Sequence, residues 1–87
     1  GSQVEIAAEA PRAGDLRRQA AHDAVARLSP RQRQVLIEMA RGKLNKQIAW
    51  DLDLTERTIK MHRAALFRAL GVQTTADAIR TAVEAGY

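Results

Sequence analysis

The stretch TERTIKMHRAALFRAL, residues 55–70, decides the fold and has the pattern of one amphipathic helix. Thr55 can cap its start, because a threonine hydroxyl accepts a free backbone N–H of the first turn. Glu56 then lies where the positive end of the helix dipole favours an anion. Four residues recur at helical spacing and define one face that can rest on a core, namely Ile59, His62, Leu66 and Leu70.

The opposite face of this helix is narrow and cationic. It carries three basic residues, no carboxylate and a small residue in its middle. A helix that is apolar on one side and slim and positive on the other can sit on a small core and enter a DNA major groove. The residues of this face are Arg57, Lys60, Met61, Ala64 and Arg68.

Length and composition narrow the class of protein. Eighty-seven residues are enough for one domain, and the absence of cysteine excludes a disulfide framework and a cysteine-based zinc finger. With one Phe, one Tyr and one Trp, the core has to come from aliphatic residues, which suits short packed helices. No apolar run approaches the ~20 residues that a membrane span needs, so we expect no membrane partner and a cytoplasmic protein.

The positive charge is concentrated in the middle of the chain. Residues 30–70 contain nine Lys or Arg and four Asp or Glu, whereas the whole chain has a net charge of only +4. This placement is expected if the middle faces a polyanion, although a generic solvated surface is the alternative.

The first 27 residues are predicted to lie before the domain. Residues 1–2 look like a cloning scar, and residues 3–27 like an interdomain linker that is helical over about 15–28, with Asp15 as its cap. An alanine-rich stripe of Leu16, Ala20, Ala24 and Leu28 could pack on the domain, mediate self-association or fray. The domain itself is expected to span residues 28–87.

Capping signals divide the rest into three more helices. Ser29, Pro30 and Gln32 form a capping-box start for a helix that reaches about Arg41 and stops at Gly42. A short helix follows over about residues 46–52, with Asn45 as its expected cap because Leu44 cannot serve. Trp50 falls on its surface, where packing on the chain is slightly favoured over contact with a phosphate or another domain.

The turn after the short helix is tight. Asp53 can take the left-handed conformation that such a turn often needs. Two helices joined this closely form a helix-turn-helix unit. Gly71 ends the central helix, and Thr75 is expected to cap a last helix to about Ala85 whose outer face the small core does not need. That face holds Ala76, Arg80 and Val83.

Spaced motifs over residues 28–86 resemble the LuxR-type four-helix DNA-binding domain. They include LSPRQRQVL at 28–36, NKQIA at 45–49, TIKMH at 58–62 and LGV at 70–72. Within that family, WDLDL at 50–54 and RTIKMHR at 57–63 are most similar to the output domains of FixJ- and NarL-type response regulators. The resemblance implies an all-α fold of four helices after a linker helix.

The resemblance also implies a function, namely sequence-specific binding of double-stranded DNA by the output domain of a two-component response regulator that controls transcription. The third helix of the domain would lie in the major groove. The implied partners are double-stranded DNA, a second copy of the chain, an N-terminal receiver domain and RNA polymerase. The implied base contacts are Lys60, Met61 and Ala64, and the implied phosphate contacts are Lys46 and Thr58. To these we add Arg57 for the bases and Thr55, Arg63 and Arg68 for phosphates, although Arg68 could instead serve the helix dipole. The candidate dimer contacts are Ala76, Arg80 and Val83.

Other functions receive less support from the residues. No Gly-rich phosphate loop, cysteine nucleophile or spaced carboxylate pair is present, so we expect no enzyme, no catalytic residue and no cofactor. His62 lacks partners at ligand spacing, so no metal site is expected either. Two alternatives stay open: a module that docks a receiver domain or RNA polymerase, and an output domain whose missing partner binds an autoinducer.

Overall fold

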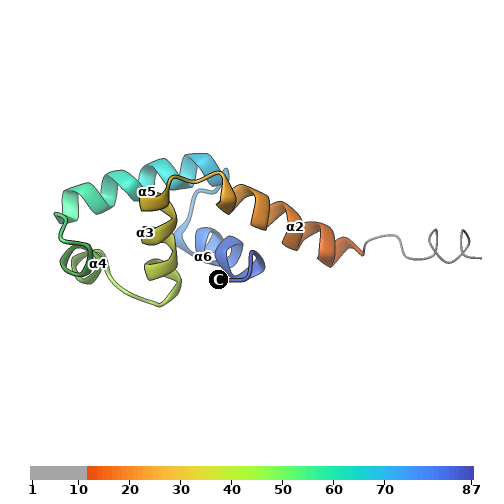
Figure 1. Cartoon of the computed structure of the whole chain (residues 1–87), viewed down its shortest axis with the longest axis horizontal. Coiled ribbons are helices and arrows are strands. Elements are labelled where there is room, and N and C mark those ends of the chain that lie inside the picture. Colours follow the sequence, from red (N-terminus) through yellow and green to blue (C-terminus); the bar gives the residue numbers. More distant parts are fainter. Residues whose placement is uncertain (1–11) are drawn as a thin grey trace, which may run out of the picture.

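The computed structural model describes residues 12–87, and these residues form five helices in the order α2, α3, α4, α5 and α6 (Figure 1). The expected all-α fold is therefore confirmed for these residues, and α2 stands in the place of the predicted linker helix. The expected scar and the linker segment 3–11 lie outside the described residues. The bounds are α2 Ala13–Ala26, α3 Pro30–Ala40, α4 Asn45–Leu52, α5 Glu56–Leu70 and α6 Thr75–Glu84.

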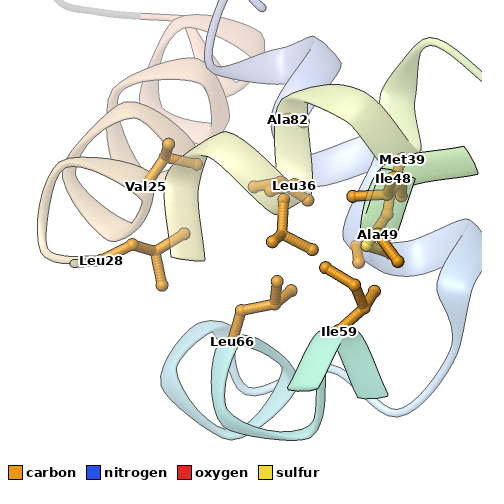
Figure 2. Close-up of a cluster of buried hydrophobic side chains, with 11 residues drawn as sticks. Val25, Leu28, Leu36, Met39, Ile48, Ala49, Ile59, Leu66 and Ala82 are labelled. Atoms are coloured by element: carbon orange, nitrogen blue, oxygen red, sulfur yellow. The ribbon is translucent and has the colours of Figure 1, made fainter. Parts of the chain in front are cut away.

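One aliphatic core holds the helices together. Helix α3 packs against α5 and α6, while α4 lies against α5 at one end of the domain and α2 reaches α6 from the other (Figures 1 and 2). The side chains that are completely buried come from all five helices, as expected for a core with so few aromatic residues. They are Val25, Val35, Leu36, Ile48, Ile59, Leu66, Ala78 and Ala82.

The starts of α3 and α5 follow the sequence expectation. Ser29 Oγ accepts from the Gln32 N–H at 3.1 Å, and Gln32 Oε1 accepts from the Ser29 N–H at 3.0 Å, which confirms the capping box. Thr55 Oγ1 accepts from the Thr58 N–H at 3.1 Å, which confirms the cap of α5. Gly71, with φ 71°, ends α5 in the left-handed conformation.

The predicted caps of α4 and α6 are each wrong by one residue. The cap position of α4 is Leu44, and Asn45 is the first residue of the helix. The cap of α6 is Thr74, whose hydroxyl accepts from the Asp77 N–H at 3.1 Å, and Thr75 is again the first helical residue. The physical reason is the same in both cases, because Leu44 and Thr74 have the extended backbone of a cap residue, with ψ 160° and ψ 155°. The side-chain oxygens of Asn45 and Thr75 instead accept hydrogen bonds from Arg63.

Helix α2 also differs from its predicted form. It begins after Arg12, so Asp15 lies in the first turn rather than at the cap, where its carboxylate pairs with Arg18. It ends at Ala26 because Ser29, which precedes a proline, is extended at ψ 157° and the chain must leave the helix before it. The face that packs on the domain contains Ala21 and Val25, while Leu16 and Ala20 of the predicted stripe are exposed.

The expectation that Trp50 packs on its own chain is wrong. Its side chain is 86% exposed on the outer face of α4. The reason is the orientation of α4. Ile48 and Ala49 point into the core, and Trp50, the next residue along the helix, therefore points away from it.

Candidate nucleic-acid interface

Helices α4 and α5 form the helix-turn-helix unit that the sequence predicts. The turn between them needs only three residues, because Asp53 takes the left-handed conformation with φ 55° and ψ 46°. The Leu54 N–H then donates to the Ala49 carbonyl at 2.8 Å, which closes the end of α4. The unit is seated by Ile48 and Ala49 from α4 and by Ile59 from α5 (Figure 2).

The five residues predicted on the outer face of α5 are all exposed. Burial of Ile59 and Leu66 on the core side orients the helix, so that the opposite face meets solvent along its length. Met61 is 65% exposed, which is unusual for a large apolar side chain and is suited to contact with a ligand surface. The other exposed residues of this face are Arg57, Lys60, Ala64 and Arg68.

The residues predicted to contact phosphates occupy three different environments. Lys46 is exposed in the first turn of α4, and Arg68 is exposed in the last turn of α5. The hydroxyls of Thr55 and Thr58 lie 3.0 Å apart at the start of α5 and share a hydrogen bond. The start of α5 thus presents hydroxyl oxygens beside backbone N–H groups, an arrangement that suits an anionic ligand.

Arg63 differs from the other predicted phosphate ligands because its side chain is half-buried and bonded within the molecule. One terminal nitrogen donates to Asn45 Oδ1 at 2.5 Å, and the other donates to Thr75 Oγ1 at 2.5 Å. The central carbon of the guanidinium lies 5.8 Å from the centre of the Phe67 ring. The structure therefore brings Arg63 to the junction of α4, α5 and α6.

Beside this junction lies a cluster of charges that the sequence analysis missed. Glu38, 8% exposed, is buried at the end of α3 and pairs with Arg41 at 2.7 Å and with Lys43. Lys43 Nζ also lies 2.6 Å from Asp51 on α4. The hydrogen bonds to Asp51 and Glu38 raise the pKa of Lys43 above its ordinary value of 10.5. The sequence did contain a signal for the burial of Glu38, because this residue stands between the apolar residues Ile37 and Met39 of α3.

Arg33 is a second residue that sequence reasoning did not single out. Its guanidinium donates to the backbone carbonyls of Val25, Ala26 and Leu28 at 3.5, 3.2 and 3.2 Å. These carbonyls lie at or just beyond the end of α2, where the last turn lacks helical donors. Arg33 therefore caps α2 from α3 and joins the two helices.

The predicted dimer residues lie on an exposed face of α6. Ala76, Arg80 and Val83 are all exposed, and Val83 is 60% exposed. Arg80 pairs with Asp77 one turn earlier at 2.6 Å. The buried side of the same helix consists of Ala78 and Ala82, so the exposed face is not needed for the core of this chain.

The described residues contain no group of three or more His, Cys, Asp or Glu side chains that is arranged to hold a metal ion. Among residues 12–87 no helix is both long enough and apolar enough to cross a membrane.

A helix-turn-helix seated on a small aliphatic core, with a cationic outer face on its second helix, defines the class of protein as a regulatory domain of the helix-turn-helix type. Residues 26–82 match the model of the luxR family of bacterial regulatory proteins. The chain belongs to this family, and it is a regulator domain rather than an enzyme.

Relatives in the curated collection of proteins are bacterial regulators. The chain is 45% identical over 53 residues to the response regulator protein TodT of Pseudomonas putida, a match that covers 61% of this chain and 23% of that protein. It is 38% identical over 60 residues to the transcriptional regulatory protein FixJ of Rhizobium meliloti, which covers 69% of this chain and 29% of FixJ. With MctR of Rhizobium johnstonii the identity is 42% over 59 residues, or 68% of this chain and 28% of MctR. The chain thus spans less than a third of each relative.

Proposed function

We propose that the domain binds double-stranded DNA in a sequence-specific way, with α5 in the major groove, as the output domain of a bacterial response regulator. The observation that carries the proposal is the outer face of α5. It exposes Arg57, Lys60 and Arg68 without a carboxylate among them, on a helix whose other side is buried in the core through Ile59 and Leu66. The groove of B-DNA admits one α-helix, and its edges carry acceptors for these cations.

One set of residues is proposed to supply affinity for DNA, and a second set to discriminate between base sequences. Cations and hydroxyls at Lys46, Thr55, Thr58 and Arg68 are placed to neutralise or bond phosphates, which supplies affinity that falls as salt rises. Side chains on the outer face of α5 supply discrimination through base edges. Arg57 and Lys60 offer hydrogen-bond donors, and Met61 and Ala64 offer apolar contact, for example to a thymine methyl.

The two-component context rests on the relatives. TodT is named a response regulator, and the chain spans only a part of it, so we propose an N-terminal receiver domain whose phosphorylation controls this domain. We further propose that the protein works in the cytoplasm as a homodimer through Ala76, Arg80 and Val83. Two-fold binding would place half-sites about 10 bp apart, or one turn of DNA.

The test is a binding measurement on the labelled domain. A duplex is first selected from a random-sequence pool, and its affinity is then measured by fluorescence anisotropy at several salt concentrations. We expect Lys60→Ala to weaken binding and, where Lys60 also meets a phosphate, to reduce the slope of log K against log salt by about 0.9. Arg17→Ala is the matched control, because it removes an equal charge from the exposed face of α2.

NMR shifts on adding the duplex give an independent readout. We expect them at Thr58, Lys60, Met61 and Ala64 and expect them to fade at high salt. A domain that selects no duplex, or whose Arg17→Ala and Lys60→Ala variants lose affinity equally, contradicts the proposal.

The exposure of Trp50 favours a second candidate function, the docking of a protein such as a receiver domain or RNA polymerase. Trp50 borders a hollow of about 530 Å³ whose lining also includes Lys46, Leu54 and Glu56. Such docking would be insensitive to salt and would survive Lys60→Ala, but it would be lost in Trp50→Ala. Pull-down with a purified receiver domain, in parallel with the DNA measurement, separates the two functions.

A further inference from the structure

We propose that Arg63 is a positioning residue, whose guanidinium holds the first turns of α4 and α6 against the middle of α5 and so sets the angle at which α5 is presented to DNA. This inference rests on the proposed function. It assigns to Arg63 a role inside the molecule in place of the phosphate contact that the family resemblance implies.

The two acceptors of Arg63 occupy equivalent places in the fold. Asn45 is the first residue of α4, and Thr75 is the first residue of α6. They are separated from Arg63 by 18 and 12 positions in the chain, so both bonds join elements that are distant in sequence. One side chain thus fixes the starts of two helices relative to a third.

The chemistry of the guanidinium suits this role. Its planar fork carries donors at fixed angles, so that it can serve two acceptors at once, whereas a lysine ammonium is a single point of charge. The guanidinium carbon also lies 5.8 Å from the centre of the Phe67 ring, within the range of a cation–π interaction. With both terminal nitrogens engaged and the side chain half-buried, fewer donors are available to a phosphate than at Lys46 or Arg68.

The position of Arg63 also carries an electrostatic cost, which favours a specific role for its two hydrogen bonds. A cation beside two helix N-termini is disfavoured by the dipole of each helix. The side-chain oxygens of Asn45 and Thr75 offset this repulsion, but they are then unavailable as caps. The cap position of α4 is Leu44, which has no side-chain acceptor. The first turn is supported by the Leu44 N–H bond to Gln47 Oε1 at 2.9 Å and by the Ile48 N–H bond to the Leu44 carbonyl at 3.0 Å.

Helix α4 depends on this bond for its orientation. Within residues 12–87, the Asn45–Arg63 hydrogen bond is the one side-chain hydrogen bond between α4 and α5, while Lys43 bridges Asp51 of α4 to Glu38 of α3. The remaining contacts of α4 with α5 are apolar and include Ile48 and Ala49, which permit small rotations more readily than a directional bond does. Loss of the bond should therefore change the angle between α4 and α5 while the core persists.

The experiment uses four variants, with Arg63→Ala added for the salt series, at a temperature where circular dichroism shows each to be folded. Arg63→Lys keeps the charge and removes the fork, Asn45→Ala and Thr75→Val each remove one acceptor, and Thr75→Ser restores the hydroxyl. Affinities are measured for the duplex selected by the parent domain and for a scrambled duplex, each across a salt series. Residual dipolar couplings report the orientation of α4 relative to α5.

We expect the first three variants to bind the selected duplex about tenfold more weakly, the scale of one lost hydrogen bond to a charged group. We also expect a smaller affinity ratio between the two duplexes, an unchanged salt slope and altered couplings in α4, with Thr75→Ser close to the parent. Lys60→Ala is the contrasting control, because it should leave the couplings of α4 unchanged.

Two results would overturn the proposal. One is a salt slope lower by about 0.9 in Arg63→Ala with parental affinity in Asn45→Ala and Thr75→Val, which would make Arg63 a phosphate ligand. The other is a loss of stability alone, with the duplex ratio and the couplings unchanged. If Arg63→Lys does not fold, Asn45→Ala and Thr75→Val carry the test. If the parent selects no duplex, the proposed function fails, and the couplings still decide whether Arg63 orients α4.

Discussion

At the scale of single residues, the carboxylate of Glu38 shows how a buried charge is accommodated in this small domain. Glu38 lies at the end of α3 with its side chain 10% exposed, and Arg41 and Lys43 neutralise it. Lys43 in turn reaches Asp51, so that one ammonium links α3 to α4. Burial of a charge is tolerated only when it is paired in this way.

The raised pKa of Lys43 predicts how stability depends on pH. Because the folded state holds the proton more tightly than the unfolded state, the stabilisation is fully present below the ordinary pKa of 10.5. It is lost as the pH rises through the higher pKa of the folded state. Urea unfolding of the parent and of Lys43→Arg, which stays charged, should differ by a constant amount between about pH 6 and pH 9, and the parent should weaken relative to the variant above that range.

The Lys43→Arg comparison cancels the contributions of all groups that the two proteins share. A difference that stays constant up to the limit of alkaline unfolding would show that the contacts of Lys43 with Asp51 and Glu38 do not contribute.

At the scale of elements, the N-termini of the helices differ in how they are capped. Ser29, Thr55 and Thr74 each accept a hydrogen bond from the backbone N–H three residues later. Leu44 has the extended backbone of a cap residue, with φ −80° and ψ 160°, but lacks an acceptor and exposes 71% of its surface. Helix α4 therefore shares with α2, whose cap position is Arg12, a start that lacks a side-chain cap and can be improved.

We predict that Leu44→Ser stabilises the domain by about 0.5–1 kcal/mol, the usual contribution of a serine cap. The measurement is the free energy of unfolding in urea, and the matched control is Leu44→Ala, which also removes the exposed apolar side chain but adds no acceptor. Equal stability of the two variants would mean that the first turn of α4 gains nothing from a side-chain cap.

At the scale of the whole molecule, the packing of α2 decides where the folded unit begins. Val25 is completely buried in the same cluster as Leu36 and Leu66 (Figure 2). In addition, Arg33 caps the end of α2 from α3. Helix α2 therefore contributes to the core, although residues 3–27 were expected to be a linker. We propose that the cooperative unit includes at least the second half of α2.

This packing yields a prediction about stability. Val25→Ala should lower the free energy of unfolding by roughly 2 kcal/mol, because it removes two buried methyl groups and leaves a cavity. Leu16→Ala, at a position 57% exposed on the same helix, should change it by less than about 0.5 kcal/mol. Both are measured by urea unfolding followed by circular dichroism, and similar values for the two would indicate that α2 is not part of the cooperative unit.

Local patterns in the sequence were sufficient to predict that the helices form and which residues lie on the outer face of α5. Ser29, Thr55, Asp53 and Gly71 act through backbone groups within a few residues, so their roles can be predicted without tertiary information. The apolar period of α5 likewise determines which side faces the core, and so which cations remain exposed.

Only the tertiary structure decided the roles of residues whose partners lie far away in the chain. Asn45 and Thr75 are good caps by residue type, and it is the position of Arg63 in space that redirects them. The burial of Val25, the capping of α2 by Arg33 and the exposure of Trp50 likewise depend on how the helices pack against one another. Each outcome depends on which surfaces the packed helices bring together, and periodicity within one helix contains no information about that choice.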